Sequence, residues 1–546
     1  MDGAGLRSDA STKRLTLVAC ILGSGIVLLD GTVVNVALPT IQRSLGGGLA
    51  AQQWVVNGYL LTLGSLILIG GSLGDVFGER RVFELGVGGF GVASLACALS
   101  PSIGVLVAAR AVQGVAGALL VPSSLAVIVN VFPEDERGPA IGSWTAWGAI
   151  AGVLGPLAGG ELLSLASWRV VFLMNLPLVA GCVALIRLAL PAGAPREPAG
   201  AAAGVSARVS RRVDLAGAAL CAFGLGGPVF ALIEQPRLGR TSPAVLGPLI
   251  AGVVLFAVFL GFERRTRDPM LPLALFRRRN FAAGNVETLA MYAGLAILFF
   301  FLILFLQQIG GYTPLKSGLA TLPVTVVMFF LSRRFGGLAD RFGPRFFMGA
   351  GPLVGAAGLL LFQRTGAKAD YASEVLPPLL VFSLGLSMTV APLTAAVLAG
   401  SERQSGIASG VNNAVARVAG LLGTAAVGAA ISSSFASALD AKLAGAQLGR
   451  QAREAVSAAK RLPLGRPDVK GLPAGQAHAL GLAAEHASLH SFHLGMAIAA
   501  ALVALGGLVG AAGIRNPRTL GRASECAGGQ LVGVSSPREQ AGAEAA

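Results

Sequence analysis

The feature that most constrains this chain is a series of apolar runs, each about 20 residues long, separated by charges or by Gly and Pro. A helix of that length crosses the ~30 Å hydrocarbon core of a bilayer. Strands of a membrane barrel are excluded, because they form alternating segments of only ~10 residues. We therefore predict an all-α membrane protein with fourteen transmembrane helices. The expected spans are 15–38, 53–73, 82–100, 103–130, 139–163, 169–190, 213–233, 243–262, 281–307, 315–332, 346–363, 375–399, 406–433 and 491–513.

The composition agrees with a helical membrane protein. Hydrophobic residues make up 54% of the 546 residues, and the 76 glycines favour helices that pack closely in lipid. A net charge of +15 is typical of nucleic-acid-binding proteins, but no basic stretch has interleaved aromatic residues, so no nucleic-acid partner is expected. Four of the five cysteines lie in apolar runs, which gives no sign of a disulfide framework. The first run is longer than the apolar core of a signal peptide, so we interpret it as a retained helix.

The distribution of Lys and Arg predicts the orientation. With a cytoplasmic N-terminus, most of the 42 basic residues fall in the two termini and in the loops on the same side. The positive-inside rule therefore predicts a multi-pass protein of the inner (cytoplasmic) membrane with both termini in the cytoplasm. Outside the helices we expect a cytoplasmic N-tail (1–14), a cytoplasmic linker (191–212), an extracytoplasmic loop with Ala-rich helical patches (434–490) and a disordered cytoplasmic tail (514–546).

Two ionisable residues lie inside apolar runs. Asp30 in the first run costs at least ~2.5 kcal/mol at that depth, and Arg110 in the fourth run cannot lose its proton, so it must be paired or hydrated. In the predicted topology Asp30 lies ~22 Å along its helix from the cytoplasm, and Arg110 lies ~10 Å below the outer surface. These depths coincide in a ~30 Å core. We predict an Asp30–Arg110 ion pair within reach of protons from outside.

A short motif occurs twice. The stretch 71–81 lies between the second and third runs, and the similar stretch 337–345 lies between the tenth and eleventh. If 213–262 is an insertion of two helices, these are equivalent loops of two six-helix halves, 15–190 and 281–513. Repeated halves that rock about a central site are the architecture of alternating access.

Together these features resemble the major facilitator superfamily, in particular its fourteen-helix drug:proton antiporters, over roughly 15–433 and the last helix. The loop with Asp75 resembles the family's loop between helices 2 and 3, although Val76 and Glu79 stand where basic residues are common. Arg110 and Gln113 resemble the family's arginine motif, which is associated with proton coupling. The resemblance implies a major facilitator fold of two six-helix halves plus two inserted helices.

The fifth run resembles the motif associated with antiporters. Gly155 and Gly159 give it a thin face, and Pro156 removes a backbone hydrogen bond, so this helix can bend. In the thirteenth run, Arg417 lies ~18 Å along its helix, near the middle of the membrane. A cation there needs a carboxylate, a substrate anion or water.

The candidate residues fall into three groups. For proton coupling we predict Asp30, Arg110 and Glu287. For the substrate pathway we predict Asp30, Asn35, Gln113, Glu287, Phe301, Gln307, Asn412 and Arg417. For conformational gating we predict Gly71, Asp75, Gly78, Arg80, Arg81, Gly155, Pro156, Gly159, Asp340, Arg341 and Gly343.

Other polar residues receive structural interpretations. Asp214 is expected to cap the start of a helix at the cytoplasmic mouth, and Glu234 to be solvated near a loop. His486, His490 and His493 have a spacing that suits metal binding or pH sensing, but we favour a solvated helix face and expect no metal site.

No Walker loop, dinucleotide fingerprint or hydrolase elbow occurs in a fitting context, so we expect no enzyme and no cofactor. The predicted function is a monomeric, proton-coupled antiporter that exports hydrophobic or cationic drugs, energised by the proton gradient. Two other classes stay open. One is a transporter of the same fold with a single dedicated substrate, such as a self-made antibiotic or a lipid, or an uptake permease. The other is a membrane sensor or scaffold that transports nothing.

Overall fold

The structure is a computed structural model that describes residues 3–189, 213–267, 269–398 and 405–516. The predicted linker 191–212 and most of the predicted tail 514–546 lie outside these residues. Because α1 begins at Gly3, most of the predicted N-tail 1–14 is helical.

Helices make up nearly all of the described chain. They are α1 (Gly3–Leu45), α2 (Leu49–Phe77), α3 (Glu79–Ala98), α4 (Ile103–Val131), α5 (Glu134–Leu165), α6 (Val170–Leu173), α7 (Asn175–Ala189), α8 (Leu215–Leu238), α9 (Pro243–Glu263), α10 (Arg279–Gln308), α11 (Pro314–Ala320), α12 (Leu322–Phe342), α13 (Pro344–Leu361), α14 (Leu376–Leu398), α15 (Ser405–Leu443), α16 (Arg450–Ala459) and α17 (Ala474–Gly513). The single turns are η2 (Leu273–Arg277), η3 (Phe362–Arg364) and η4 (Tyr371–Val375). Within these residues fourteen segments are long and apolar enough to cross a membrane, which confirms the predicted number. One segment combines α6 with α7, and another combines α11 with α12.

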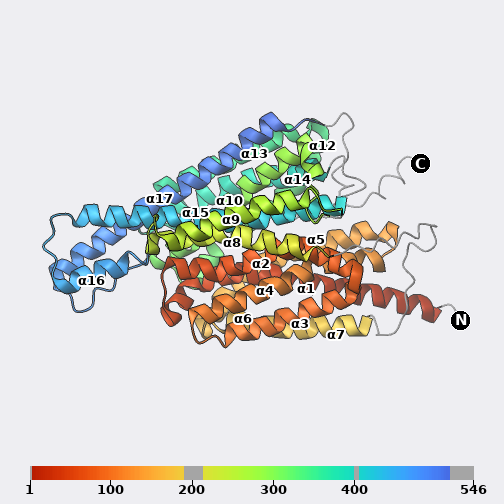
Figure 1. Cartoon of the computed structure of the whole chain (residues 1–546), viewed down its shortest axis with the longest axis horizontal. Coiled ribbons are helices and arrows are strands. Elements are labelled where there is room, and N and C mark those ends of the chain that lie inside the picture. Colours follow the sequence, from red (N-terminus) through yellow and green to blue (C-terminus); the bar gives the residue numbers. More distant parts are fainter. Residues whose placement is uncertain (1–2, 190–212, 268, 399–404, 517–546) are drawn as a thin grey trace.

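The helices lie along one long axis, and the start of α1 and the end of α17 lie at the same end of the molecule (Figure 1). We call this end the terminal end. The opposite end, from which residues 434–490 project, is called the hairpin end.

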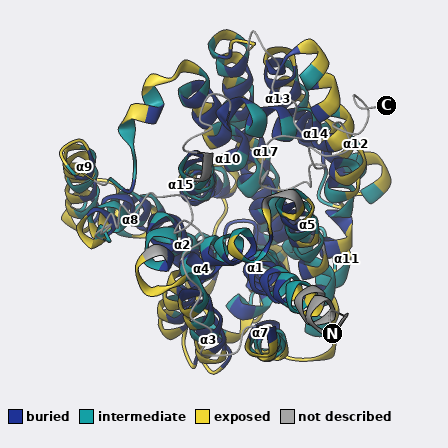
Figure 2. Cartoon of the chain, turned by 90° about the vertical axis from the view of Figure 1, so that its right-hand side faces the viewer, coloured by how far each residue is buried: buried dark blue, intermediate teal, exposed yellow. Residues whose placement is uncertain are grey.

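The view from the terminal end shows two groups of helices, α1–α5 with α7 on one side and α10, α12–α15 and α17 on the other (Figure 2). Helix α11 belongs in sequence to the second group, because it shares one candidate span with α12, but it lies next to α5 of the first group. Helices α8 and α9 lie on the flank, next to α2 and α15. Val229 and Ile233 of α8 pack against Leu421 and Ala425 of α15. The inserted pair therefore covers the seam between the two groups.

Small residues let α5 approach α1. A Cβ atom at Gly155 would lie 2.9 Å from the Leu29 carbonyl oxygen, and one at Gly159 would collide with the Val33 side chain. In lipid, close backbone contact of this kind supplies the attraction between helices. The predicted thin face of α5 is therefore used to pack α5 on α1.

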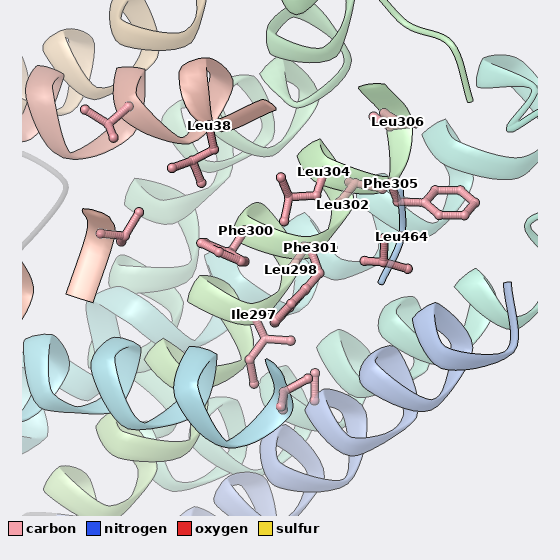
Figure 3. Packing of buried hydrophobic residues seen from close by; sticks show 14 of the residues in the cluster. Leu38, Ile297, Leu298, Phe300, Phe301, Leu302, Leu304, Phe305, Leu306 and Leu464 are labelled. Carbon is pink, nitrogen blue, oxygen red and sulfur yellow. The ribbon is translucent and has the colours of Figure 1, made fainter. Parts of the chain in front are cut away.

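The largest apolar cluster joins the two groups. Figure 3 shows Leu38 of α1 beside the α10 residues Phe300 and Leu304, all of them buried. Leu464, from the projecting segment, belongs to the same cluster and is also buried. The core therefore crosses the interface between the groups, and residues from the hairpin end take part in it.

The predicted loop 434–490 contains more helix than expected. Helix α15 continues to Leu443, α17 begins at Ala474, and α16 lies between them. An apolar cluster that includes Phe435 and Leu480 holds this projection together. It contacts both groups, because the Leu49 N–H donates to the Arg461 carbonyl at 3.1 Å and Arg466 Nη2 donates to the Ile309 carbonyl at 3.1 Å.

The two copies of the repeated motif have the same backbone turn. Gly78 joins α2 to α3 with φ +89° and ψ 127°, and Gly343 joins α12 to α13 with φ +85° and ψ 148°. Left-handed φ values of this kind favour glycine. Asp75 and Asp340, which we expected in loops, instead lie in the last turns of α2 and α12. The side chain of Asp75 lies outside the described part of the structure.

Candidate functional site

Asp30 of α1 and Arg110 of α4 form a buried ion pair. Their side chains are 0% and 1% exposed, and Arg110 Nη1 donates to Asp30 Oδ2. Arg110 Nε also donates to the Val55 carbonyl of α2 at 3.1 Å. The predicted pairing is therefore confirmed as a contact. The attraction between the two opposite charges offsets much of the cost of taking each of them out of water.

The second oxygen of Asp30 accepts two further hydrogen bonds. Gln113 Nε2 donates to Asp30 Oδ1 at 3.1 Å, and Asn175 Nδ2 donates to the same oxygen at 3.0 Å. Gln113 Oε1 accepts from Arg110 Nη1 at 2.7 Å, which closes a ring of contacts around the ion pair. Three donors therefore converge on one carboxylate.

Asn175 and Ser94 were not among the predicted site residues. Ser94 Oγ of α3 accepts from Asn175 Nδ2 at 2.9 Å and donates to the Phe172 carbonyl at 2.9 Å. Both residues are fully buried polar groups within apolar spans. A polar residue within an apolar span was the signal that the sequence offered for them. It does not show which helix each residue faces.

Aromatic rings cover the guanidinium group of Arg110. Its Cζ atom lies 4.2 Å from the centroid of the Tyr59 ring and 5.8 Å from that of Phe172. Tyr59 is held by a hydrogen bond of 3.2 Å from its hydroxyl to the Val27 carbonyl. A cation over a ring face gains about 0.5–2 kcal/mol, more when it is desolvated. The rings therefore stabilise Arg110 in its buried position.

A cavity of about 310 Å³ lies between the two groups of helices. Helices from both groups line it, and its walls are mainly apolar and aromatic. Its polar side chains include Thr32, Asn35, Tyr59, Arg110, Tyr292, Thr321, Thr325, Asn413, Arg417 and Thr424. Arg110 lines the cavity, but Asp30 does not. Arg110 therefore connects the buried carboxylate of Asp30 to the wall of the central space.

Three of the predicted site residues besides Arg110 line the cavity. Asn35 lies in its wall with a buried Oδ1 that accepts no hydrogen bond from a described residue. Arg417 of α15 and Pro156 of α5 also line it. The cavity therefore combines residues from opposite halves of the sequence, as expected for a central pathway.

Glu287 and Phe301 do not line the cavity. Glu287 is fully buried in α10, and a Cβ atom at Gly510 of α17 would collide with its Oε2. Neither oxygen of Glu287 has a hydrogen-bond partner among the described residues. Phe301 packs in the apolar core, and the aromatic wall of the cavity is formed by Phe299 and Phe300 instead.

Three further residues predicted for the pathway are engaged elsewhere. Gln113 belongs to the network around Asp30. Asn412 Nδ2 donates to Thr288 Oγ1 at 2.7 Å within the second group of helices. Gln307 Nε2 donates to the Val36 carbonyl of α1 at 3.0 Å. Gln307 therefore ties the two groups together near the hairpin end.

The two groups are closed against each other at the hairpin end. A Cβ at Gly318 of α11 would lie 2.6 Å from the Pro156 carbonyl oxygen of α5. Gln53 Nε2 of α2 donates to the Thr424 carbonyl of α15 at 2.6 Å. Gln307 adds the contact with Val36. The structure therefore represents a state in which backbone contacts and hydrogen bonds close this end.

The gating motif makes local contacts in this state. Arg80 Nε donates to Glu84 Oε1 at 2.9 Å, while Arg81 is exposed. Arg341 is also exposed, with its guanidinium 5.4 Å from the Phe342 ring centroid, and Asp340 is half-buried. Gly71 lies in α2 with open space around it.

The remaining candidates have structural partners. Asp214 caps α8, as predicted, because its Oδ1 accepts from the Gly217 N–H at 2.7 Å. Glu234 is buried rather than solvated, since it accepts from Trp54 Nε1 at 3.0 Å and pairs with Arg237 at 2.9 Å.

The histidines do not form a metal site in the structure. His486 and His490 are exposed, and the ring of His493 contacts the Thr365 carbonyl at 2.9 Å. Within the described residues no group of three or more His, Cys, Asp or Glu side chains could hold a metal ion.

Comparisons with known proteins give relatives of similar length. The chain is 34% identical over 434 residues to multidrug resistance protein Stp of Mycobacterium tuberculosis, which covers 79% of this chain and 78% of that protein. It is 35% identical over 437 residues to the tetracenomycin C resistance and export protein of Streptomyces glaucescens, with 80% and 79% covered.

The fold is similar to that of a solved transporter. A bacterial homologue of the human lysosomal transporter Spinster, in an inward-facing and unoccupied conformation, matches with a TM-score of 0.59 at 15% identity, over 93% of this chain and 99% of that one. The sequence model described as Major Facilitator Superfamily matches residues 20–424. From its fourteen candidate spans, its central cavity and this match, the chain belongs to the Major Facilitator Superfamily of membrane transporters.

Proposed function

We propose that this transporter is a proton-coupled antiporter that exports hydrophobic, antibiotic-like compounds across the cytoplasmic membrane. The relatives support export, since one is named for multidrug resistance and another for tetracenomycin C resistance and export. The terminal end faces the cytoplasm in this proposal, because the basic loops lie there. One chain forms the whole cavity, so the working unit is a monomer.

The observation that carries the proposal is the position of Arg110. Its guanidinium bonds to Asp30, which can bind a proton, and the residue is also part of the wall of the cavity, which can hold a substrate. A proton on Asp30 removes the charge that compensates Arg110. Protonation therefore changes the wall of the cavity without any contact between substrate and Asp30.

The proposed cycle uses two states. The present state, closed at the hairpin end, has the ion pair intact, and a substrate enters the cavity from the cytoplasm. In the state open at the hairpin end, the substrate leaves and Asp30 takes up a proton from outside. The empty, protonated carrier then returns to the present state, and Asp30 releases its proton to the cytoplasm. Export is coupled to proton entry as long as the empty carrier changes state only when Asp30 is protonated. Glu287 is a second proton-binding candidate, because neither of its oxygens has a donor among the described residues.

Transport by the purified full-length protein in liposomes tests this function. A panel of fluorescent hydrophobic compounds is presented with and without an imposed pH gradient. We expect the gradient to drive accumulation of some compounds and a protonophore to abolish it. Failure to move any of the compounds would refute export, and transport at the same rate without the gradient would refute proton coupling.

Growth of a host that lacks its own pumps provides a second test. Expression of the transporter should raise tolerance to the compounds that move in liposomes. The width of this panel also separates a multidrug exporter from an exporter of one dedicated compound.

A further inference from the structure

Arg417 is a charged residue in the cavity wall whose charge no described residue compensates. It is half-buried in α15 and makes no hydrogen bond or ion pair with any residue that the structure describes. Arg110, the other guanidinium in the wall, is paired with Asp30. Among the described residues that line the cavity, Arg110 is therefore neutralised by Asp30, and Arg417 has no partner.

A free cation in the middle of a membrane-spanning bundle needs water or a counter-charge. Water can fill this role while the cavity is empty. A substrate that fills about 310 Å³ displaces that water, so the substrate itself must satisfy the guanidinium. Arg417 therefore favours substrates that carry a negative group.

A positively charged substrate finds no such partner. None of the described residues that line the cavity is acidic. Asp30 is occupied by Arg110, Gln113 and Asn175, and Glu287 is directed at α17 rather than at the cavity. Of the predicted hydrophobic or cationic drugs, the charges of the cavity wall therefore disfavour the cationic ones.

The apolar part of the cavity is aromatic. Tyr59, Tyr292, Phe299 and Phe300 contribute to its walls, and Arg417 lines the same cavity. Aromatic walls bind flat rings by stacking and edge contacts, and a guanidinium binds a carboxylate through two parallel hydrogen bonds. The volume lies within the range of pockets for drug-sized ligands.

We propose that the central cavity selects aromatic anions, namely flat and largely apolar ring compounds with one carboxylate or phenolate oxygen. The anionic oxygen binds Arg417, and the ring system lies against Tyr59, Tyr292, Phe299 and Phe300. This inference rests on the proposed export function, since it names the class of compound that the exporter carries. An inside-negative membrane potential drives such an anion outward and opposes export of a cation.

Three compounds with one ring system test the charge preference. They are 9-anthracenecarboxylate, the neutral 9-anthracenemethanol and the cationic 9-anthracenemethylammonium. Binding to the purified full-length protein in nanodiscs is measured by fluorescence anisotropy. We expect the carboxylate to bind at least about tenfold more tightly than the ammonium compound, with the alcohol between them. Equal or tighter binding of the ammonium compound, or no binding of the carboxylate, would overturn the proposal.

Variants of Arg417 test the residue itself. Arg417→Gln should weaken carboxylate binding at least about tenfold and change binding of the alcohol less than about twofold, while Arg417→Lys should retain part of the preference. Arg453→Gln, on the exposed face of α16, removes one positive charge far from the cavity and serves as the matched control. Unchanged carboxylate binding in Arg417→Gln would also overturn the proposal. If that variant does not fold, the comparison of the three compounds on the unmodified protein still decides.

Transport of the same three compounds separates this inference from the proposed function. Charge-selective binding of the carboxylate without any movement under a pH gradient would leave the inference standing and refute proton-coupled export. Gradient-driven export of the ammonium compound in preference to the carboxylate would support the export function and refute the inference.

Discussion

Replacement of Asp30 by asparagine is the most direct perturbation of the ion-pair network. Asparagine keeps the size of the side chain and removes its charge, so Arg110 stays buried at 1% exposure without a counter-charge. Three donors converge on the two Asp30 oxygens: Arg110 Nη1, Gln113 Nε2 at 3.1 Å and Asn175 Nδ2 at 3.0 Å. Asparagine offers only one oxygen, and its amide NH₂ group meets at least one of these donors.

The expected loss of stability follows from this geometry. Removal of one partner of a buried ion pair costs about 3–5 kcal/mol, which is a factor of more than 100 in the unfolding equilibrium. The matched control is Asp440→Asn, which breaks an exposed pair with Lys460 at 2.6 Å and should cost no more than about 1 kcal/mol. The double variant Asp30→Asn/Arg110→Gln removes both charges, so its cost should be smaller than the sum of the two single costs.

Two measurements check this prediction. Unfolding in mixed detergent micelles gives the stability of the four variants. Uptake by liposomes gives transport, in which Asp30→Asn should lose accumulation driven by a pH gradient and still bind substrate, because Asp30 does not line the cavity. If Asp30→Asn is as stable as Asp440→Asn and accumulates substrate normally, the ion pair neither stabilises the fold nor couples protons.

Three further substitutions test packing, turns and closure. Gly155→Ala places a Cβ 2.9 Å from a carbonyl of α1 and should destabilise the protein by about 1–3 kcal/mol, whereas Gly181→Ala, with open space around it, should be neutral in the same unfolding assay. Gly78→Ala should cost about 1–2 kcal/mol because φ is +89°, whereas Gly71→Ala, within α2, should be neutral or stabilising by up to ~1 kcal/mol; equal effects would contradict the strained turn. Gln307→Ala loses two hydrogen bonds, of 3.0 Å to the Val36 carbonyl of α1 and of 2.9 Å to Ser317. Distances between spin labels on α5 and α11 should then show more molecules in which these helices have separated, by roughly tenfold if the loss is about 1.4 kcal/mol. An unchanged distance distribution would show that this residue does not hold the hairpin end closed.

The number of spanning helices and one central contact could be predicted from the sequence. An apolar run of about 20 residues forms a helix as long as the hydrocarbon core of a bilayer is thick. The fourteen runs therefore predicted fourteen spans, and the described residues contain fourteen candidate spans. The depths of Asp30 and Arg110 followed from the predicted topology, and a shared depth made a contact between two opposite charges the favoured outcome. Both inferences need only distance along the membrane normal.

The sequence did not show which face of each helix lines the cavity, because this depends on how the helix is rotated about its axis. Phe300 and Phe301 are neighbours in sequence but point about 100° apart on α10, and only Phe300 lines the cavity. Glu287 faces α17 and Asn412 faces its own group of helices for the same reason. Hydropathy assigns a residue to a membrane span. It does not show which neighbouring helix that residue faces when the helix is buried on all sides.

The predicted end of α15 came too early and the predicted start of α17 came too late, for a different reason. Hydropathy indicates where a helix leaves the lipid, not where its backbone hydrogen bonds stop. Residues 434–443 and 474–490 are helical beyond the predicted spans, and they are held by packing against each other and α16. Tertiary contacts of this kind are not visible in a window of apolar residues.

The position of Arg110 between Asp30 and the cavity has a consequence for the evolution of substrate specificity. In the proposed cycle, the residue that takes up the proton, Asp30, and the residues that contact the substrate are different, and Arg110 lies between them. Replacement of Phe299, Thr325 or Asn413 can alter what is carried while the source of energy stays untouched. Under this proposal, proteins with the same energy-coupling residues can evolve to export different compounds through single substitutions in the cavity wall.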